Sequence, residues 1–253
     1  MTNGKALTST IGENLNGCTC SFDLYAMINH TASTHCPLCA SLRTTFWHQD
    51  QRRPVAGREY WQCGNCALVF VPEAFHISSE AEKALYDLHE NDPNDLGYRR
   101  FLSRAVTPIV QHFADHPDPQ VLQGLDFGCG PGPTVSLLLA EAGLRCANYD
   151  LYYFDDRALL TQPYDFIIST EVFEHLAAPF EAFAQLIPLL KSGGIFVIMT
   201  QRPLDLAAFS RWGYTLDPTH ITFFREASFA WVAEHFGLAV IAVERDVVVL
   251  QKP

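Results

Sequence analysis

Apolar and polar positions in the C-terminal half of the chain form runs of two kinds. Short β-branched and aromatic runs predict buried strands, and longer runs with apolar residues every three to four positions predict helices. We expect strands at 121–127, 145–149, 166–169, 195–199, 238–243 and 247–250, and helices at 134–142, 179–190 and 226–236. Strands that alternate with helices are typical of a parallel sheet, so the pattern predicts an α/β domain over residues 119–253.

The N-terminal half has a different pattern. Residues 1–34 carry few periodic apolar positions and many Thr, Asn, Ser and Gly residues, so we expect a flexible leader. Residues 35–72 contain short aromatic and β-branched runs that are typical of strands. Residues 73–118 have helical periodicity with a break at Asn91–Asp95, and we interpret them as a helical bridge between two domains.

Two Cys-x-x-Cys pairs lie in the 35–72 segment, Cys36 with Cys39 and Cys63 with Cys66. Each pair can supply two thiolates from one turn, and structural zinc prefers four such ligands in a tetrahedron. The spacing therefore predicts a small zinc ribbon, whose metal contributes much of its folding free energy. A redox site needs only one such pair, at a helix N-terminus, and iron in the same four-cysteine site stays an alternative.

Composition and charge limit the class of protein. The 253 residues are 48% hydrophobic and 18% charged, which excludes disorder as a description of the whole chain. No apolar run approaches the roughly 20 residues of a transmembrane helix, and Met1–Gly17 lacks the pattern of a signal peptide. We therefore expect a cytoplasmic protein without a membrane partner. The net charge of −11 disfavours a protein that coats nucleic acid, which needs a basic surface.

A glycine-rich turn follows the first predicted strand of the α/β domain. Gly128, Gly130 and Gly132 alternate just before a predicted helix, and Asp126 lies two residues before the first glycine. Such glycines let the backbone approach a ligand closely and expose N–H groups near a helix N-terminus. The dinucleotide-binding fingerprint G-x-G-x-x-G is the alternative, but its last glycine would fall on Pro133.

Together with later segments, this turn resembles the motifs of class I S-adenosylmethionine-dependent methyltransferases. Asp150 ends the second strand of the domain, where the family places an acid on the ribose hydroxyls. Residues 164–176 resemble the family's fourth-strand motif, and residues 191–195 resemble its turn into the fifth strand. The resemblance covers residues 121–253 and implies a Rossmann-like sheet. The combination with an N-terminal zinc ribbon resembles bacterial methyltransferases whose substrates are uncharacterised.

One segment departs from the family's pattern. Residues 151–163 separate two predicted strands, and this stretch is too short for a helix, a strand and a second helix, since one βαβ unit takes about 30 residues. We therefore expect the family's third strand to be missing or vestigial.

The resemblance also implies a cofactor and its ligands. S-adenosylmethionine would lie on the glycine loop, with Asp126 on the ammonium group of its methionine end and Asp150 on its ribose. Cys129 would contribute through its backbone only. The implied cofactor-binding residues are Asp126, Gly128, Cys129, Gly130, Gly132, Asp150 and Glu171.

Candidate catalytic residues follow the fourth and fifth strands of the family's pattern, because ligands bind outside the carboxyl ends of parallel strands. Glu171 and His175 follow the fourth strand. His220 lies in the aromatic, turn-rich segment 211–224, which we interpret as a substrate-facing flap. A histidine with a pKa near 6.5 suits proton uptake at neutral pH, so His220 is the predicted general base and His175 is chiefly structural.

The sequence thus predicts methyl transfer from S-adenosylmethionine to an unidentified acceptor. The negative net charge and the aromatic flap favour a small molecule or metabolite over nucleic acid as that acceptor. A zinc-dependent RNA methyltransferase and a non-catalytic S-adenosylmethionine-binding adaptor are the alternatives. A nicotinamide-dependent oxidoreductase is disfavoured by the glycine spacing.

Overall fold

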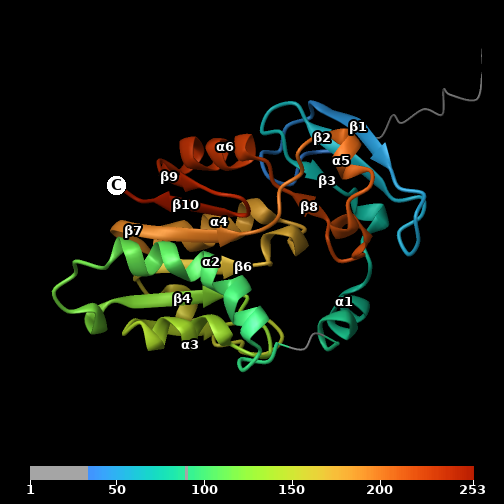
Figure 1. Cartoon of the computed structure of the whole chain (residues 1–253). Helices are drawn as coiled ribbons and strands as arrows, with labels where there is room; N and C mark the ends of the chain where they lie inside the picture. The colour runs from blue at the N-terminus through green and yellow to red at the C-terminus, as the bar shows by residue number, and fades with distance from the viewer. Residues whose placement is uncertain (1–33, 89–90) are drawn as a thin grey trace, which may run out of the picture. The chain divides into compact units, whose positions relative to one another are not determined.

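A six-stranded sheet forms the centre of the computed structural model, which describes residues 34–88 and 91–253. Residues 1–33 of the expected leader lie outside the described residues. The parallel strands are β4 Gln123–Phe127, β5 Arg145–Tyr149, β6 Tyr164–Thr170 and β7 Leu190–Met199, and the antiparallel ones are β9 Ala239–Val243 and β10 Val247–Gln251. Across the sheet their order is β5-β4-β6-β7-β10-β9 (Figure 1).

Helices cover both faces of this sheet. Helices α2 Leu96–His112 and α3 Thr134–Glu141 lie on one face, and α4 Pro179–Leu186 and α6 Glu226–Phe236 lie on the other (Figure 1). Successive side chains of a strand point to opposite faces, so Phe166 and Ile168 pack toward α2 and α3 while Ile167 packs toward α4 and α6. Each of these three buried side chains contributes about 1.5–3 kcal/mol to folding. The layers confirm the predicted α/β class.

The family's third strand is missing, as the length of the 151–163 segment predicted. β5 forms the edge of the sheet. Among residues 151–163, all of which are described, the regular structure is limited to an isolated bridge between Asp150 and Phe154 and a short 3₁₀ turn at Arg157–Thr161. The 151–163 segment therefore connects β5 directly to the parallel strand β6, on the other side of β4.

A second, antiparallel sheet contains the predicted ribbon and one strand from the α/β domain. Its strands are β1 Thr44–Gln49, β2 Glu59–Cys63, β3 Val69–Phe70 and β8 Thr222–Phe223, in the order β1-β2-β3-β8. β8 belongs to the segment 211–224, which we interpreted as a substrate-facing flap, and it pairs with β3. A buried apolar cluster joins the ribbon to the segment that carries β8, and it includes Tyr60, Phe209 and Phe223.

Several element boundaries differ from the sequence-based expectation. The helical bridge contains α1 Ser79–Tyr86 and α2, and the side chain of Asp95 caps α2 by accepting the N–H of Tyr98 at 2.8 Å. β7 begins at Leu190, so residues 191–194 lie within the strand, and its pairing with β6 is irregular there, where we expected a turn. β1, β8 and the one-turn helix α5 Leu206–Phe209 were not predicted. Within the described ranges, every helix is too short or too polar to span a bilayer.

Candidate active site

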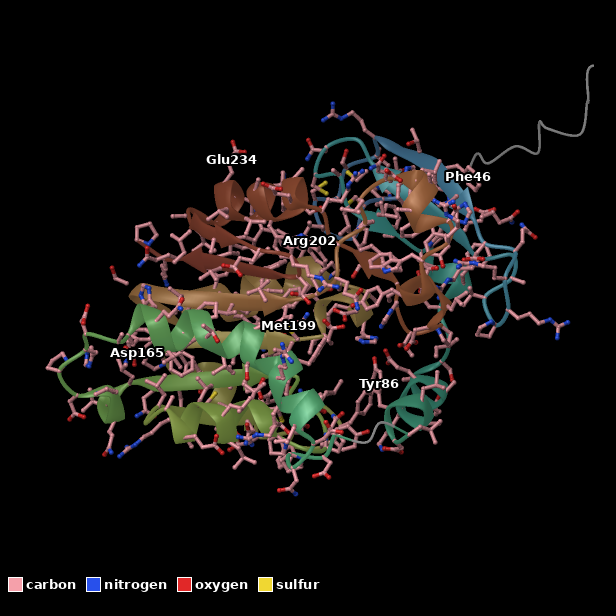
Figure 2. The ribbon with its side chains drawn as sticks, in the orientation of Figure 1. Phe46, Tyr86, Asp165, Met199, Arg202 and Glu234 are labelled. Carbon is pink, nitrogen blue, oxygen red and sulfur yellow. The ribbon has the colours of Figure 1, made fainter. Side chains whose placement is uncertain are left out.

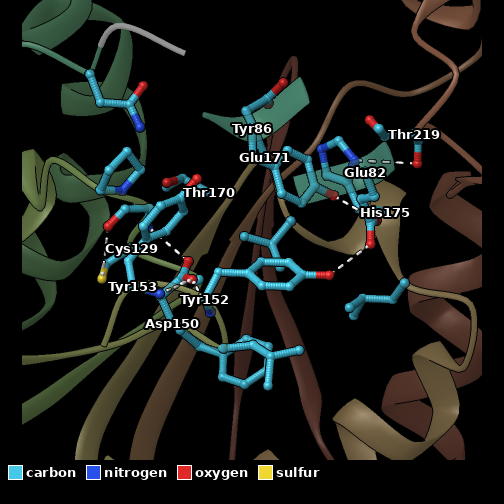
Figure 3. A pocket seen from close by; sticks show the side chains of 18 of the residues that line it. Glu82, Tyr86, Cys129, Asp150, Tyr152, Tyr153, Thr170, Glu171, His175 and Thr219 are labelled. Atoms are coloured by element: carbon cyan, nitrogen blue, oxygen red, sulfur yellow. Dashed lines mark hydrogen bonds between the residues drawn. The ribbon is translucent and has the colours of Figure 1, made fainter. Parts of the chain in front are cut away.

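A cavity of about 1060 Å³ lies at the carboxyl ends of β4, β5 and β6. Figure 3 shows part of its wall, with Asp150 on one side and His175 on the other. Asp126 and Gly132 do not line this cavity. The predicted site residues that do are Gly128, Cys129, Gly130, Asp150, Glu171, His175 and His220.

The glycine loop packs tightly against two neighbouring segments. Gly128 has a φ of +82°, and a Cβ atom there would lie 2.4 Å from Cγ2 of Val172 in the segment after β6. A Cβ atom at Gly132 would lie 2.1 Å from the carbonyl oxygen of Asn91. Side chains at these positions would push the loop away from its neighbours, so the glycines set the position of the backbone at the cavity wall.

Asp150 ties the end of β5 to the glycine loop. Its Oδ1 atom accepts the backbone N–H groups of Tyr152 at 2.8 Å and Tyr153 at 3.2 Å. Its Oδ2 atom accepts the N–H of Gly130 at 3.0 Å. A carboxylate oxygen has two lone pairs, so Oδ2 keeps one of them for a ligand in the cavity.

Asp126 and Cys129 have buried side chains. Both carboxylate oxygens of Asp126 lack a hydrogen-bond partner among the described residues, and burial, together with the charge of Asp150, raises its pKa to about 8. Burial also raises the pKa of the Cys129 thiol, which keeps the thiol protonated and unreactive. Cys129 can therefore contribute to ligand binding through its backbone.

Helix α1 forms another wall of the cavity, although none of its residues is among the predicted catalytic or cofactor-binding residues. Glu82 accepts hydrogen bonds from the hydroxyls of Tyr86 at 2.8 Å and Tyr152 at 3.0 Å. The hydroxyl of Tyr153 donates to Asp87 at 2.8 Å. Tyr86 extends from α1 to the edge of the His175 ring, with 5.3 Å between ring centroids (Figures 2 and 3).

Glu171 and Glu174, which follow β6, both face the hydroxyl of Tyr214. The Tyr214 hydroxyl donates to Oε1 of Glu174 and lies 3.3 Å from Oε2 of Glu171. Glu171 has a φ of +52°, an uncommon conformation for a residue other than glycine. Burial, together with the nearby charge of Glu174, raises the pKa of Glu171 to about 9. Neither Glu174 nor Tyr214 is among the site residues predicted from sequence.

The two candidate histidines are brought together, with 4.7 Å between their ring centroids. Nδ1 of His220 lies 2.7 Å from the carbonyl oxygen of Tyr214, and Nδ1 of His175 lies 3.3 Å from that of Thr219. A carbonyl can only accept, so we assign the proton to Nδ1 in each ring, which leaves a lone pair on Nε2. Burial lowers the pKa of His220 and so favours its neutral form at pH 7.

The four ribbon cysteines form a cluster that fits a zinc-binding region. Their sulfur atoms lie within 4.8 Å of one another, and the pairs Cys36–Cys66 and Cys39–Cys63 are each 3.5 Å apart. A tetrahedron with zinc–sulfur bonds of about 2.3 Å has edges of about 3.8 Å, whereas a disulfide bond is about 2.05 Å long. The spacing therefore fits four thiolates around one metal ion and excludes disulfides between these pairs.

Comparison with known protein families decides the class of the α/β domain. Residues 98–243 match the family described as "methyltransferase domain". The chain belongs to this family. The match confirms the resemblance to class I S-adenosylmethionine-dependent methyltransferases and the prediction that the chain is a methyltransferase. The matched region begins in α2, the helix that covers one face of the sheet.

Similar solved structures include other methyltransferases. Magnesium protoporphyrin IX methyltransferase from Synechocystis PCC 6803 is 19% identical, with 70% of this chain and 95% of that chain covered and a TM-score of 0.46. The 1,6-didemethyltoxoflavin-N1-methyltransferase from Burkholderia thailandensis is 15% identical, with 73% of this chain and 95% of that chain covered and a TM-score of 0.44. No curated protein matches the methyltransferase described here.

Proposed function

We propose that the cavity binds S-adenosylmethionine at the glycine loop and a small-molecule acceptor beside Glu171, His175 and His220. The observation that carries this proposal is that the loop with Asp150 and the pair of histidines line one cavity (Figure 3). Methyl transfer requires the methyl carbon and the nucleophile to be held in contact, and a shared cavity permits that.

The residues around the loop fit this cofactor. The remaining lone pair on Oδ2 of Asp150 can accept a ribose hydroxyl. Leu151 is 56% exposed and lines the cavity next to Asp150, so it offers an apolar surface to the adenine ring. Asp126 is fully buried and does not line the cavity, so this proposal gives it no contact with the cofactor.

When bound, S-adenosylmethionine supplies a methyl group that its positively charged sulfur has already activated. The main task of the protein is therefore to position the acceptor and to exclude water. His220 presents a lone pair on Nε2 to the cavity, and we propose that this lone pair activates the acceptor. His175 and Tyr86 pack beside it and restrict the orientation of its ring.

A small molecule is the favoured acceptor class. The cavity volume of about 1060 Å³ is close to the upper end of the ~300–1,000 Å³ that small-ligand sites occupy. The net charge of −11 provides little attraction for the phosphate backbone of RNA. We further propose that the four ribbon cysteines bind one structural zinc ion, as their spacing favours.

Label transfer tests this proposal. The protein is incubated with S-adenosylmethionine that carries a tritiated methyl group and with cell extract separated by size, before and after nuclease treatment. We expect label in the small-molecule fraction, and a turnover that is lower by about 100-fold in His220→Ala, within the range of acid–base and acceptor-activating groups. Nuclease-sensitive label would favour the RNA methyltransferase instead. Binding of S-adenosylmethionine without any transfer would favour the non-catalytic adaptor.

A further inference from the structure

Three metal-ligating side chains lie close together beside the proposed acceptor site. The proposed methyl transfer does not by itself require this arrangement. The ligand atoms of Glu174, His175 and His220 all lie within 4.8 Å of one another. Glu174 is fully buried, and its Oε2 atom has no hydrogen-bond partner among the described residues. A buried carboxylate oxygen without a partner is costly, which points to a missing positively charged ligand.

The orientation of both imidazole rings also fits a metal site. Each ring directs its Nδ1–H group at a backbone carbonyl, that of Tyr214 for His220 and that of Thr219 for His175. Histidines that bind metal typically use one nitrogen and donate the other N–H to a carbonyl or carboxylate, which fixes the ring. The Nε2 lone pairs of both rings are therefore available in one place.

The hydrogen bonding of the acidic groups in the pocket points the same way. Glu171 and Glu174 share the single proton of the Tyr214 hydroxyl, which can be donated to only one of them at a time. The second oxygen of each carboxylate, Oε1 of Glu171 and Oε2 of Glu174, is buried and has no partner among the described residues. Asp217 adds a further carboxylate, whose Oδ2 lies 3.9 Å from Nε2 of His220.

We propose that Glu174, His175 and His220 bind one divalent cation of the first transition series, such as Mn²⁺. Two imidazoles with a carboxylate suit these ions, whereas Mg²⁺ and Ca²⁺ prefer oxygen ligands throughout. Ligand atoms about 2.1 Å from an ion lie about 3–4.2 Å apart, so the side chains need to close only slightly. This site is chemically distinct from the four-thiolate cluster of the ribbon, which suits zinc.

The position of the ion suits a role at the acceptor. His175 and His220 line the cavity, whereas Glu174 lies behind them and does not. The open coordination positions would therefore face the cavity, where an acceptor oxygen could bind the ion and lose its proton to solvent water more readily. With the ion bound, Nε2 of His220 is a ligand, so His220 would activate the acceptor through the ion and not as a free base. This role, but not the binding of the ion, rests on the proposed function.

Titration with Mn²⁺ tests the site directly. The zinc-loaded full-length protein is titrated with Mn²⁺, and the electron paramagnetic resonance signal of free Mn²⁺ measures the unbound ion. We expect about one Mn²⁺ per chain, and an affinity that is lower by at least about tenfold in His220→Ala and in Glu174→Gln, as for the loss of one ligand or its hydrogen-bonded support. His235→Ala, which changes an exposed histidine on α6, is the matched control and should bind as the wild type does.

The outcomes separate this inference from the proposed function. Failure of the wild type to bind Mn²⁺, or unchanged binding in both site variants, overturns the cation site. Circular dichroism checks that each variant is folded. If Glu174→Gln is not folded, the Mn²⁺ affinity of His220→Ala alone decides whether the cation site exists. S-adenosylmethionine binding is measured separately by calorimetry without Mn²⁺, so its loss would contradict the proposed function and leave the cation site standing.

Discussion

At the scale of single residues, the protein holds buried acids whose carboxyl oxygens lack hydrogen-bond partners among the described residues. Asp126 is the clearest case, because it is fully buried and both of its oxygens lack a partner among the described residues. Its pKa of about 8 means that the folded protein holds the proton more tightly than the unfolded chain, in which an aspartate has a pKa near 4. Stability contributed by this residue must therefore fall as the pH rises between these two values.

Replacing Asp126 with Asn removes this ionisation. We expect Asp126→Asn to raise the thermal unfolding temperature of the cofactor-free protein more at pH 8 than at pH 5.5, because only at the higher pH does the wild type pay the full cost of the buried charge. Differential scanning calorimetry at both pH values measures the effect. An equal shift at the two pH values would show that Asp126 titrates normally in the folded protein.

The residues that could be predicted from sequence are those whose role follows from their position after a strand. Gly128, Gly130 and Asp150 line the cavity because the carboxyl ends of β4 and β5 open into it. Glu174 and Tyr214 were missed because they contact each other from segments far apart in the chain. The only local signal was that Glu174 follows Glu171 by three residues and precedes His175.

At the scale of elements, the ribbon supports the segment that carries His220. β8 pairs with β3, and Arg58 of the ribbon is 4% exposed and donates to the carbonyl oxygens of Asp217 and Pro218 at 3.2 Å each. A strand of two residues has almost no pattern of its own, so β8 could not be predicted. Helices α3 and α6 could, because their apolar runs extend over two or more helical turns.

Removal of the Arg58 guanidinium tests this support. Arg58→Met keeps the aliphatic stem but removes the guanidinium donors to the carbonyl oxygens of Asp217 and Pro218, so we expect a free energy of unfolding lower by about 1–3 kcal/mol, and a lower turnover. Urea denaturation and the label-transfer assay measure the two effects. Arg53→Met, at an exposed arginine of the same ribbon, is the matched control. Equal effects of the two substitutions would mean that Arg58 does not hold the flap.

Zinc removal should also destabilise the 211–224 segment, which contains β8. If one zinc ion holds Cys36, Cys39, Cys63 and Cys66, chelation should disorder β3 and thereby release β8. We expect protease cleavage within residues 211–224 as well as within the ribbon, mapped by mass spectrometry, and protection after zinc is added back. A metal-free protein that keeps 211–224 resistant would contradict the link between ribbon and flap.

At the scale of the whole molecule, the described residues belong to one compact unit in which the absence of a third strand changes how the cavity is closed. The turn after β5 carries Tyr152 and Tyr153, which hold α1 by hydrogen bonds to Glu82 and Asp87. The missing strand was predictable from chain length alone. The hydrogen bonds that hold α1 to this turn were not, because side-chain contacts between distant segments leave no periodic signal.

Binding of S-adenosylmethionine tests the central claim most directly. Isothermal titration calorimetry of the zinc-loaded protein should show about one S-adenosylmethionine per chain and no binding of NAD. Asp150→Asn places an amide donor near the N–H of Gly130 and removes the carboxylate from the cavity, so its affinity should be lower by at least about tenfold, the scale of an unpaired polar group. Binding of NAD without S-adenosylmethionine, or an Asp150→Asn variant with unchanged affinity, would contradict the account.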